Sequence, residues 1–168
     1  MQKIGIIGPA EPLCSPELYR FGVRLGEAVA VNGRIFICGG LGGFMEAVCK
    51  GIKQSPACFP GQTVGILPGE CADTANPYID LPIPTGMGEA RNLLIVRTAD
   101  ILIAVGGGAG TLSELAFAWQ FGKKVLCVDL FEGWARNLGD KDLDARQKKL
   151  LIKVNSIGEI MEHLDNSL

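Results

Sequence analysis

The sequence holds a single histidine, His163, and this scarcity limits the chemistry that the chain can perform. A Ser-His-Asp triad, a Cys-His pair and a histidine-rich zinc site each need an imidazole at a defined place. His163 lies close to the end of the chain, where a helix C-terminus favours positive charge. We therefore expect a helix-terminal role for His163, and we expect no metal coordinated by the protein.

Cys-x-x-Cys pairs, a leader segment and long apolar runs are also lacking. The six cysteines are spread along the chain, and most lie in or beside apolar segments, where a thiol behaves as a small hydrophobic group. No basic-then-apolar leader precedes residue 3, and no apolar run approaches the ~20 residues that a membrane helix needs. These features predict a reduced, cytoplasmic protein with no membrane partner.

Neither sign of charge is in excess, since 16 basic and 18 acidic side chains leave a net charge of −2. The sequence therefore lacks the basic patch that nucleic-acid binding requires, and it has no acidic tail for a cationic partner. Its 168 residues suit one domain of ordinary size, since single domains usually run to ~100–200 residues. We expect one domain over residues 1–168 and no nucleic-acid partner.

Glycine, by contrast, is abundant. The chain has 23 glycines in 168 residues, about 14% against an ordinary ~7%. The absence of a Gly-X-Y period excludes collagen, and the 48% hydrophobic content excludes disorder. Because glycine destabilises helix and strand interiors, the surplus indicates many turns or a backbone that approaches a neighbour closely.

Short apolar segments alternate with helical patterns along the whole chain. The expected strands are residues 3–8, 34–38, 63–67, 78–83, 100–105, 124–129 and 150–154. Helices are expected to begin at Ser15 and Ser156, and to cover about residues 43–53, 87–99 and 111–121. An exposed loop is expected over residues 68–78, and a polar stretch over residues 131–149. Apolar strands that alternate with helices predict a doubly wound, Rossmann-like α/β domain whose parallel sheet is covered on both faces.

Two glycine clusters, residues 39–43 and 106–110, each follow an expected strand and lead into a helix. In such sheets ligands bind beyond the carboxyl ends of the strands, and the free N–H groups of a helix N-terminus attract an anion. The alternative is that these glycines only form tight turns, but two clusters in one sheet favour a phosphate-bearing ligand.

Two nucleotide-binding fingerprints are missing. Neither G-x-G-x-x-G nor G-x-x-x-x-G-K-[ST] occurs, which disfavours a dehydrogenase and a P-loop NTPase. Asp129 follows the second glycine cluster at about the distance of a ribose-binding acid, but without the fingerprint it is interpreted as a residue at the end of a strand.

Arg91 and Glu114 flank the second glycine cluster in sequence. The alternative interpretation of Arg91 is that it lies on a solvated helix face or forms a surface ion pair. The alternative interpretation of Glu114 is that it takes part in a helix cap, because residues 111–114 (TLSE) fit a capping box with Thr111 at the N-cap. The residues alone leave both alternatives open.

Two segments around these residues resemble a known family. Residues 86–92 (GMGEARN) and 106–114 (GGGAGTLSE) are similar to the arginine and P-G-G-x-G-T-x-x-E motifs of the LONELY GUY superfamily, long labelled "possible lysine decarboxylase". Residues 39–47 (GGLGGFMEA) match its other glycine turn, and the resemblance spans roughly residues 3–130. A decarboxylase would need a lysine for pyridoxal phosphate, and nothing in the sequence argues for one.

The resemblance implies a site and a reaction. In the enzymes of this superfamily the arginine and glutamate help to hydrolyse the N-glycosidic bond of a nucleoside 5′-monophosphate, which releases the base and ribose 5-phosphate. Arg91 and Glu114 match that catalytic pair, and the turn over residues 108–111 would hold the phosphate.

The sequence departs from the enzymes at several positions. Gly106 stands where their motif has proline, and Asn92 follows the arginine where they usually have lysine. These variants, with residues 133–135 (GWA), are more similar to the molybdenum cofactor carrier proteins, which bind the phosphorylated pterin cofactor without turning it over. The resemblance further implies a homo-oligomer built from dimers.

The leading hypothesis is therefore a carrier or storage protein that binds a phosphorylated heterocycle, most specifically the molybdenum cofactor. The alternative is a phosphoribohydrolase that acts on AMP-like nucleotides through Arg91 and Glu114. A nucleotide-sensing module is a third hypothesis, for which the sequence offers no docking feature. The predicted ligand-binding residues are Gly39, Gly40, Gly42, Gly43, Arg91, Gly107, Gly108, Ala109, Gly110, Thr111 and Glu114.

Overall fold

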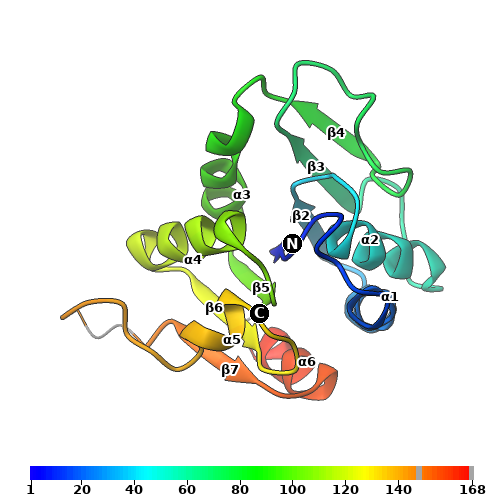
Figure 1. Ribbon diagram of the computed structural model, residues 1–168. Coiled ribbons are helices and arrows are strands. Elements are labelled where there is room, and N and C mark those ends of the chain that lie inside the picture. Colours follow the sequence, from blue (N-terminus) through cyan, green and yellow to red (C-terminus); the bar gives the residue numbers. More distant parts are fainter. Residues whose placement is uncertain (147–148, 167–168) are drawn as a thin grey trace.

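The centre of the molecule is a seven-stranded sheet in which each pair of neighbouring strands is parallel (Figure 1). This computed structural model describes residues 1–146 and 149–166. The strands are β1 (Gln2–Ile7), β2 (Arg34–Cys38), β3 (Thr63–Leu67), β4 (Leu81–Pro84), β5 (Ile101–Val105), β6 (Lys124–Val128) and β7 (Leu151–Val154). Their order in the sheet is β4-β3-β2-β1-β5-β6-β7. The chain thus builds outward from β1 to one edge and then returns to place β5 on the other side of β1, so the strand order reverses between these two strands.

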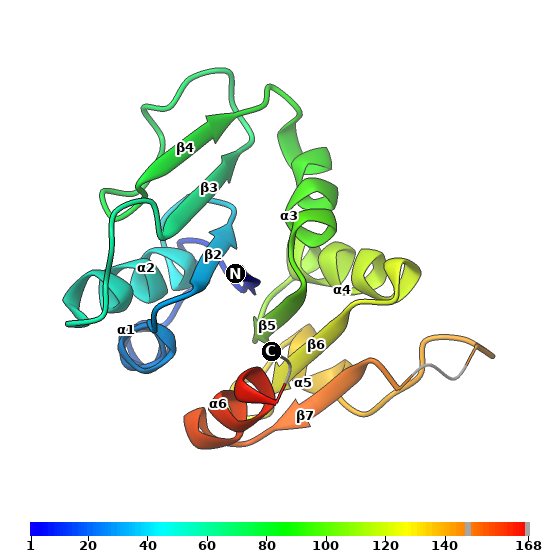
Figure 2. The same cartoon turned by 180° about the vertical axis from the view of Figure 1, so that it is seen from behind.

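Helices cover both faces of the sheet (Figures 1 and 2). Their bounds are α1 (Pro16–Val29), α2 (Phe44–Gln54), α3 (Asn92–Thr98), α4 (Ala109–Phe121), α5 (Trp134–Leu138) and α6 (Ile157–Asp165), with a short 3₁₀ helix η1 (Gly88–Arg91) before α3. One hydrophobic cluster joins α1, α2 and α6 to one face, and a second joins α3, α4 and α5 to the other. The arrangement confirms the predicted doubly wound, Rossmann-like α/β fold.

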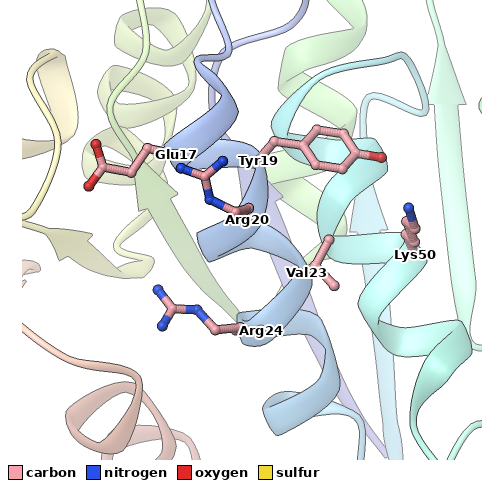
Figure 3. Close-up of a pocket in the computed structure, with 6 residues that line it drawn as sticks. All are labelled: Glu17, Tyr19, Arg20, Val23, Arg24 and Lys50. Carbon is pink, nitrogen blue, oxygen red and sulfur yellow. The ribbon is translucent and has the colours of Figure 1, made fainter.

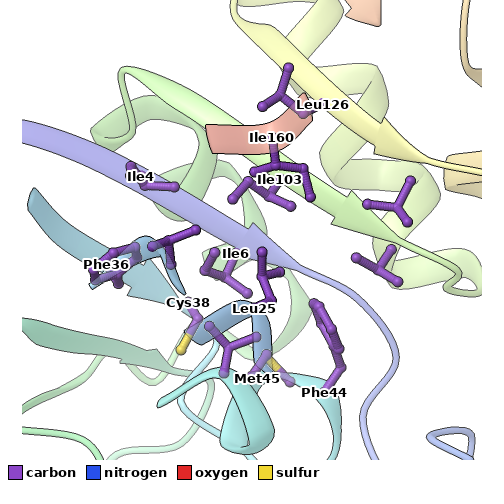
Figure 4. Close-up of a cluster of buried hydrophobic side chains, with 14 of the residues drawn as sticks. Ile4, Ile6, Leu25, Phe36, Cys38, Phe44, Met45, Ile103, Leu126 and Ile160 are labelled. Atoms are coloured by element: carbon purple, nitrogen blue, oxygen red, sulfur yellow. The ribbon is translucent and has the colours of Figure 1, made fainter. Parts of the chain in front are cut away.

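The two central strands are buried on both faces, as the apolar runs predicted. In β5, Ile101, Ile103 and Val105 pack into the cluster with α1 and α2, while Leu102 and Ala104 pack into the cluster with α3 and α4. Figure 4 shows the first cluster, in which side chains of β1, β2 and β5 meet Leu25 of α1 and residues at the start of α2. A rigid, doubly covered sheet therefore supports the loops that follow its strands.

Two expected helix caps are present. The Ser15 hydroxyl accepts a hydrogen bond from the Leu18 N–H at the start of α1. The Ser156 hydroxyl accepts one from the Glu159 N–H at the start of α6, and the Glu159 carboxylate accepts a bond from the Asn155 N–H rather than from Ser156. His163 lies in the last turn of α6, as predicted.

Three elements differ from the expected ones. The fourth strand begins at Leu81 rather than at residue 78, because Asp80 is held in a turn through hydrogen bonds with Thr63; the edge position of β4 tolerates its two prolines. The helix expected over residues 87–99 is divided into η1 and α3. The polar stretch over residues 131–149 contains helix α5, which the sequence analysis did not predict.

Candidate functional site

A cavity of about 200 Å³ lies beyond the carboxyl ends of β1 and β5, at the point where the strand order reverses. Four segments line it: the loop after β1, the beginning of α2 with the turn before it, the segment around η1, and the beginning of α4. The lining residues are Gly8, Pro9, Ala10, Leu13, Leu41, Met45, Glu89, Arg91, Asn92, Gly108, Ala109, Gly110, Thr111 and Glu114. Ligands of doubly wound sheets bind at this position.

The N-terminus of α4 forms one wall of the cavity. The helix begins at Ala109, its N-cap is Gly108, and no side chain caps its free N–H groups. The interpretation of residues 111–114 as a capping box is therefore wrong, since Thr111 is the third residue of the helix rather than its cap. The uncapped N–H groups and the helix dipole favour an anion at this wall.

Space in front of this wall depends on two glycines. A Cβ atom at Gly108 would meet only Leu13, at 3.8 Å, and a Cβ atom at Gly110 would meet only Asn92, at 3.9 Å. Gly107 has a different role, because a Cβ atom there would lie 2.1 Å from the Thr111 hydroxyl oxygen, and its φ of +87° suits glycine. Gly107 thus lets Thr111 pack beneath the turn, whereas Gly108 and Gly110 leave the turn open to the cavity.

Arg91 is buried at the cavity, with 6% of its surface exposed. Its Nη1 atom lies 3.8 Å from Glu114 Oε1, and its Nε atom has no hydrogen-bond partner in the part of the chain that the structure describes. The alternative of a solvated helix face or a surface ion pair is therefore wrong. A buried guanidinium that lines a cavity is a strong donor for an anionic ligand.

Glu114 lies beside Arg91 and is equally buried. Burial raises the pKa of its carboxyl group to about 8, although the Arg91 charge acts in the opposite direction; Cys38 and Glu89 add to the increase. The carboxyl group is therefore mainly protonated at neutral pH. In this form it can donate a hydrogen bond to an anion instead of repelling it.

The first glycine turn supports the site from behind. A Cβ atom at Gly39 would lie 2.5 Å from Arg91 Nη2, so this glycine makes room for the guanidinium. Gly43, with a φ of +83°, lets the backbone of Ala10 and Glu11 approach, and the Phe44 N–H donates to the Pro9 carbonyl. This turn therefore places both the arginine and the loop after β1.

None of the four predicted glycines of the first turn lines the cavity. A Cβ atom at Gly40 would meet Leu67 at 2.6 Å. A Cβ atom at Gly42 would meet side-chain atoms of Glu11 and Glu46 at 3.5 Å. Direct contact of Gly39, Gly40, Gly42 and Gly43 with a ligand stays a prediction. Of the other predicted residues, Arg91, Gly108, Ala109, Gly110, Thr111 and Glu114 line the cavity, whereas Gly107 does not and lines an adjoining cavity instead.

Sequence reasoning missed other lining residues. Asn92, which is buried, donates from Nδ2 to the Ser113 hydroxyl at 2.9 Å and thereby ties the start of α3 to the first turns of α4. The loop after β1 contributes Pro9, Ala10 and Leu13. Its place after the first strand was a usable signal, because carboxyl ends of neighbouring parallel strands lie at one edge of the sheet.

Asp129 does not line this cavity. Its carboxylate lies 3.2 Å from Arg136 Nε and 3.4 Å from Lys153 Nζ. These ion pairs agree with the interpretation of Asp129 as a strand-end residue rather than a ribose-binding acid.

A larger cavity, about 640 Å³, is a groove on the outer surface of α1 and α2, away from the site (Figure 3). Its lining residues are Glu17, Tyr19, Arg20, Val23, Arg24 and Lys50, none of which was predicted to bind a ligand. Within residues 1–146 and 149–166, no helix is long and apolar enough to cross a membrane. The same residues contain no cluster of three or more potential metal ligands among His, Cys, Asp and Glu.

Several curated relatives are similar to the chain in sequence. An uncharacterized protein from Archaeoglobus fulgidus is 47% identical over 125 residues, which cover 74% of this chain and 78% of the relative. A cytokinin riboside 5′-monophosphate phosphoribohydrolase from Mycobacterium marinum is 27% identical and covers 88% of this chain and 85% of its own length.

The chain is also similar to solved structures. The molybdenum cofactor binding protein of Rippkaea orientalis superimposes with a TM-score of 0.83 at 30% identity, over 98% of this chain and 96% of that one. The molybdenum cofactor carrier protein of Chlamydomonas reinhardtii gives a TM-score of 0.82 at 26% identity, over 99% and 98% of the two chains. These matches confirm the resemblance that the two glycine-rich motifs predicted. Because the model of the SLOG cluster4 family matches residues 1–161, the chain belongs to that family.

Proposed function

We propose that this protein binds a phosphorylated heterocyclic ligand and acts as a carrier or storage protein for the molybdenum cofactor. The observation that carries the proposal is the buried Arg91 guanidinium, which lines the cavity beside the uncapped N-terminus of α4. A phosphate group satisfies both kinds of donor at once. The Rippkaea and Chlamydomonas structures support the choice of cofactor.

In this proposal the site binds and shelters its ligand. The N–H groups at residues 109–111 and the Arg91 guanidinium contact the phosphate, and the protonated Glu114 carboxyl group donates a further hydrogen bond. The cofactor is cargo, so the protein needs no resident metal. We further propose that the protein is cytoplasmic and forms a homo-oligomer built from dimers.

Titration of isolated molybdenum cofactor against the protein tests this proposal. Gly108→Asp places a carboxylate in the open space before α4, and we expect it to abolish binding. Thr111→Val removes the hydroxyl group of a residue that lines the cavity, and we expect about a tenfold loss of affinity, as for one good hydrogen bond. Gly69→Asp is the matched control, because Gly69 lies in a loop outside the cavity and a Cβ atom there meets nothing within 4 Å. Undiminished binding by both site variants would refute the proposed site.

The second candidate function is hydrolysis of a nucleoside 5′-monophosphate. The approach of Arg91 to Glu114, 3.8 Å between Nη1 and Oε1, favours it together with the similarity to the Mycobacterium marinum enzyme. Here Glu114 would polarise the ribose or the attacking water. Incubation with AMP and chromatography for free adenine separates the two functions. Turnover that disappears in Glu114→Ala would favour the enzyme, and no turnover with any purine monophosphate would favour the carrier.

A further inference from the structure

A second cavity, of about 210 Å³, adjoins the candidate site. The two cavities share Pro9, Leu13 and Gly108 as lining residues. Leu18, Gly107 and Glu132 complete the second one. Gly108 therefore lies between two spaces, and it has no side chain to separate them.

The sizes of the two cavities indicate one ligand that occupies both. Sites for ligands of drug or cofactor size usually enclose ≈ 300–1,000 Å³. Each cavity alone is smaller than this, at about 200 and 210 Å³, whereas the two together fall within the range. A phosphorylated heterocycle has the matching division into an anionic end and a ring.

The second cavity has the character of a ring-binding site. Pro9, Leu13 and Leu18 give it apolar walls, and Leu13 is 71% exposed although it is a large apolar side chain. In the described part of the chain, Glu132 is the one ionisable residue that lines this cavity. The second cavity thus combines apolar contact surface with one ionisable side chain.

Backbone contacts hold Glu132 beside the glycine turn. Gly133 packs so closely on Gly106 that a Cβ atom at Gly133 would lie 2.3 Å from the Gly106 carbonyl carbon. The Trp134 N–H donates to the Gly107 carbonyl at 3.1 Å, and the Ala135 N–H donates to the Gly106 carbonyl at 3.0 Å. The position of Glu132 is therefore coupled to the same turn that opens onto the phosphate wall.

The carboxylate of Glu132 retains capacity to bind a ligand. Its Oε1 atom accepts a hydrogen bond from Arg136, which also pairs with Asp129. Its side chain is 85% exposed, and among the described residues no hydrogen bond or ion pair involves Oε2. An ionised carboxylate has about four acceptor positions, so it can accept from two neighbouring N–H groups on one ring edge.

We propose, on the basis of the binding function proposed above, that the ligand spans both cavities and that Glu132 selects heterocycles with a 2-amino-4-oxopyrimidine edge. Guanine and pterin present a ring N–H beside an exocyclic NH₂ group, and both donate to a carboxylate. Adenine presents an acceptor nitrogen beside its NH₂ group and leaves an oxygen–nitrogen repulsion. The phosphate lies against α4 and Arg91 in the first cavity, and Gly108 lets the ligand pass between them.

Calorimetric titration of the full chain with GMP, AMP and inorganic phosphate tests this selection. We expect GMP to bind about tenfold more tightly than AMP, since one mismatched polar contact is worth about that factor. Glu132→Gln should remove the preference, because its amide presents an N–H group to one of the ring donors, and it should leave phosphate affinity unchanged. Glu27→Gln, an exposed glutamate of α1 outside both cavities, is the matched control and should keep the preference.

The outcomes separate this inference from the function on which it rests. If GMP binding is abolished by Gly108→Asp but GMP is not preferred to AMP, or its preference survives in Glu132→Gln, the role of Glu132 is refuted and the phosphate site stands. If the wild-type protein binds neither GMP nor phosphate, both proposals are refuted. Loss of the GMP preference in Glu132→Gln alone supports the spanning ligand.

Discussion

At the scale of single residues, Gly39 and Arg91 illustrate how a glycine can shape a cavity that it does not line. A side chain at Gly39 would overlap the end of the Arg91 guanidinium, which is flexible, rather than the backbone. The fold can therefore accommodate the change, but the guanidinium must move. In the candidate site, Gly39 makes room for the Arg91 guanidinium.

Replacement of Gly39 by alanine should consequently weaken anion binding more than it weakens the fold. We expect Gly39→Ala to reduce affinity for inorganic phosphate or GMP about tenfold, as the loss of one charge-assisted hydrogen bond would. The midpoint of urea unfolding should shift no more than it does for an ordinary surface substitution. Titration calorimetry checks the affinity, with Gly69→Ala as the control; an unchanged affinity in Gly39→Ala would show that Arg91 does not bind the anion.

Glu114 should make stability depend on pH. Its pKa in the folded protein is about 8, above its ordinary value of 4.5, so the folded state favours the protonated form. The stabilisation is full below about pH 4.5 and is lost as the pH rises toward 8, because the unfolded chain releases the proton first. The contribution falls by up to about 1.4 kcal/mol per pH unit within this window.

Urea unfolding at a series of pH values between 5 and 8 measures this dependence. Glu114→Gln keeps the shape of the protonated carboxyl group but cannot ionise. The free energy of unfolding of this variant should therefore fall much less than that of the wild type as the pH rises from 5 to 8. The groups that act on Glu114 are Arg91, Cys38 and Glu89. A wild-type slope that persists unchanged in Glu114→Gln would assign the pH dependence to another group.

At the scale of elements, the contact between α1 and α2 depends on glycines that face each other's backbone. A Cβ atom at Gly26 of α1 would lie 2.1 Å from the Val48 carbonyl oxygen of α2. A Cβ atom at Gly51 of α2 would lie 2.0 Å from the Val23 carbonyl oxygen of α1. The two helices thus approach until their backbones touch, which places the beginning of α2 against the loop after β1.

Gly51→Ala should therefore be strongly destabilising, although alanine is the better helix former. We expect a loss of about 1–3 kcal/mol or more in the free energy of unfolding, because backbone cannot move as a side chain can. Gly158→Ala in α6 is the control: its Cβ atom would meet only the Ser156 hydroxyl at 3.7 Å, so the helix propensity should make it neutral or slightly stabilising. Denaturant unfolding compares the two, and equal stabilities would contradict the close helix packing.

At the scale of the whole molecule, we predict a homo-oligomer, which can be tested by the molecular mass of the protein in solution. The sheet ends at β4, where Leu81 and Ile83 are exposed, and Met87 is exposed shortly after this strand. Apolar side chains at a sheet edge are a common place for association. Light scattering during size-exclusion chromatography should give an even multiple of the chain mass; a monomer at micromolar concentration would contradict the resemblance-based expectation.

The sequence by itself predicted most elements of this fold and the glycine turn at the start of α4 that forms one wall of the cavity. Apolar runs such as residues 101–105 and capping residues such as Ser15 are local signals, and their effect depends little on distant parts of the chain. The glycine turn before α4 could be predicted equally well, because the strand, the glycines and the helix follow one another directly in the sequence. Local chemistry also misled: Thr111 suited an N-cap, but the N-cap of α4 is Gly108, three residues earlier.

Tertiary structure alone decided how these parts form a site. The burial of Arg91, the contact of Gly133 with Gly106, and the second cavity around Leu13 all arise between segments far apart in the sequence. Such contacts depend on the order of the strands, which brings the loop after β1 beside the turn after β5. The abundance of glycine was visible in the sequence, but which glycines line the cavity and which make room for other residues was decided by packing across the sheet.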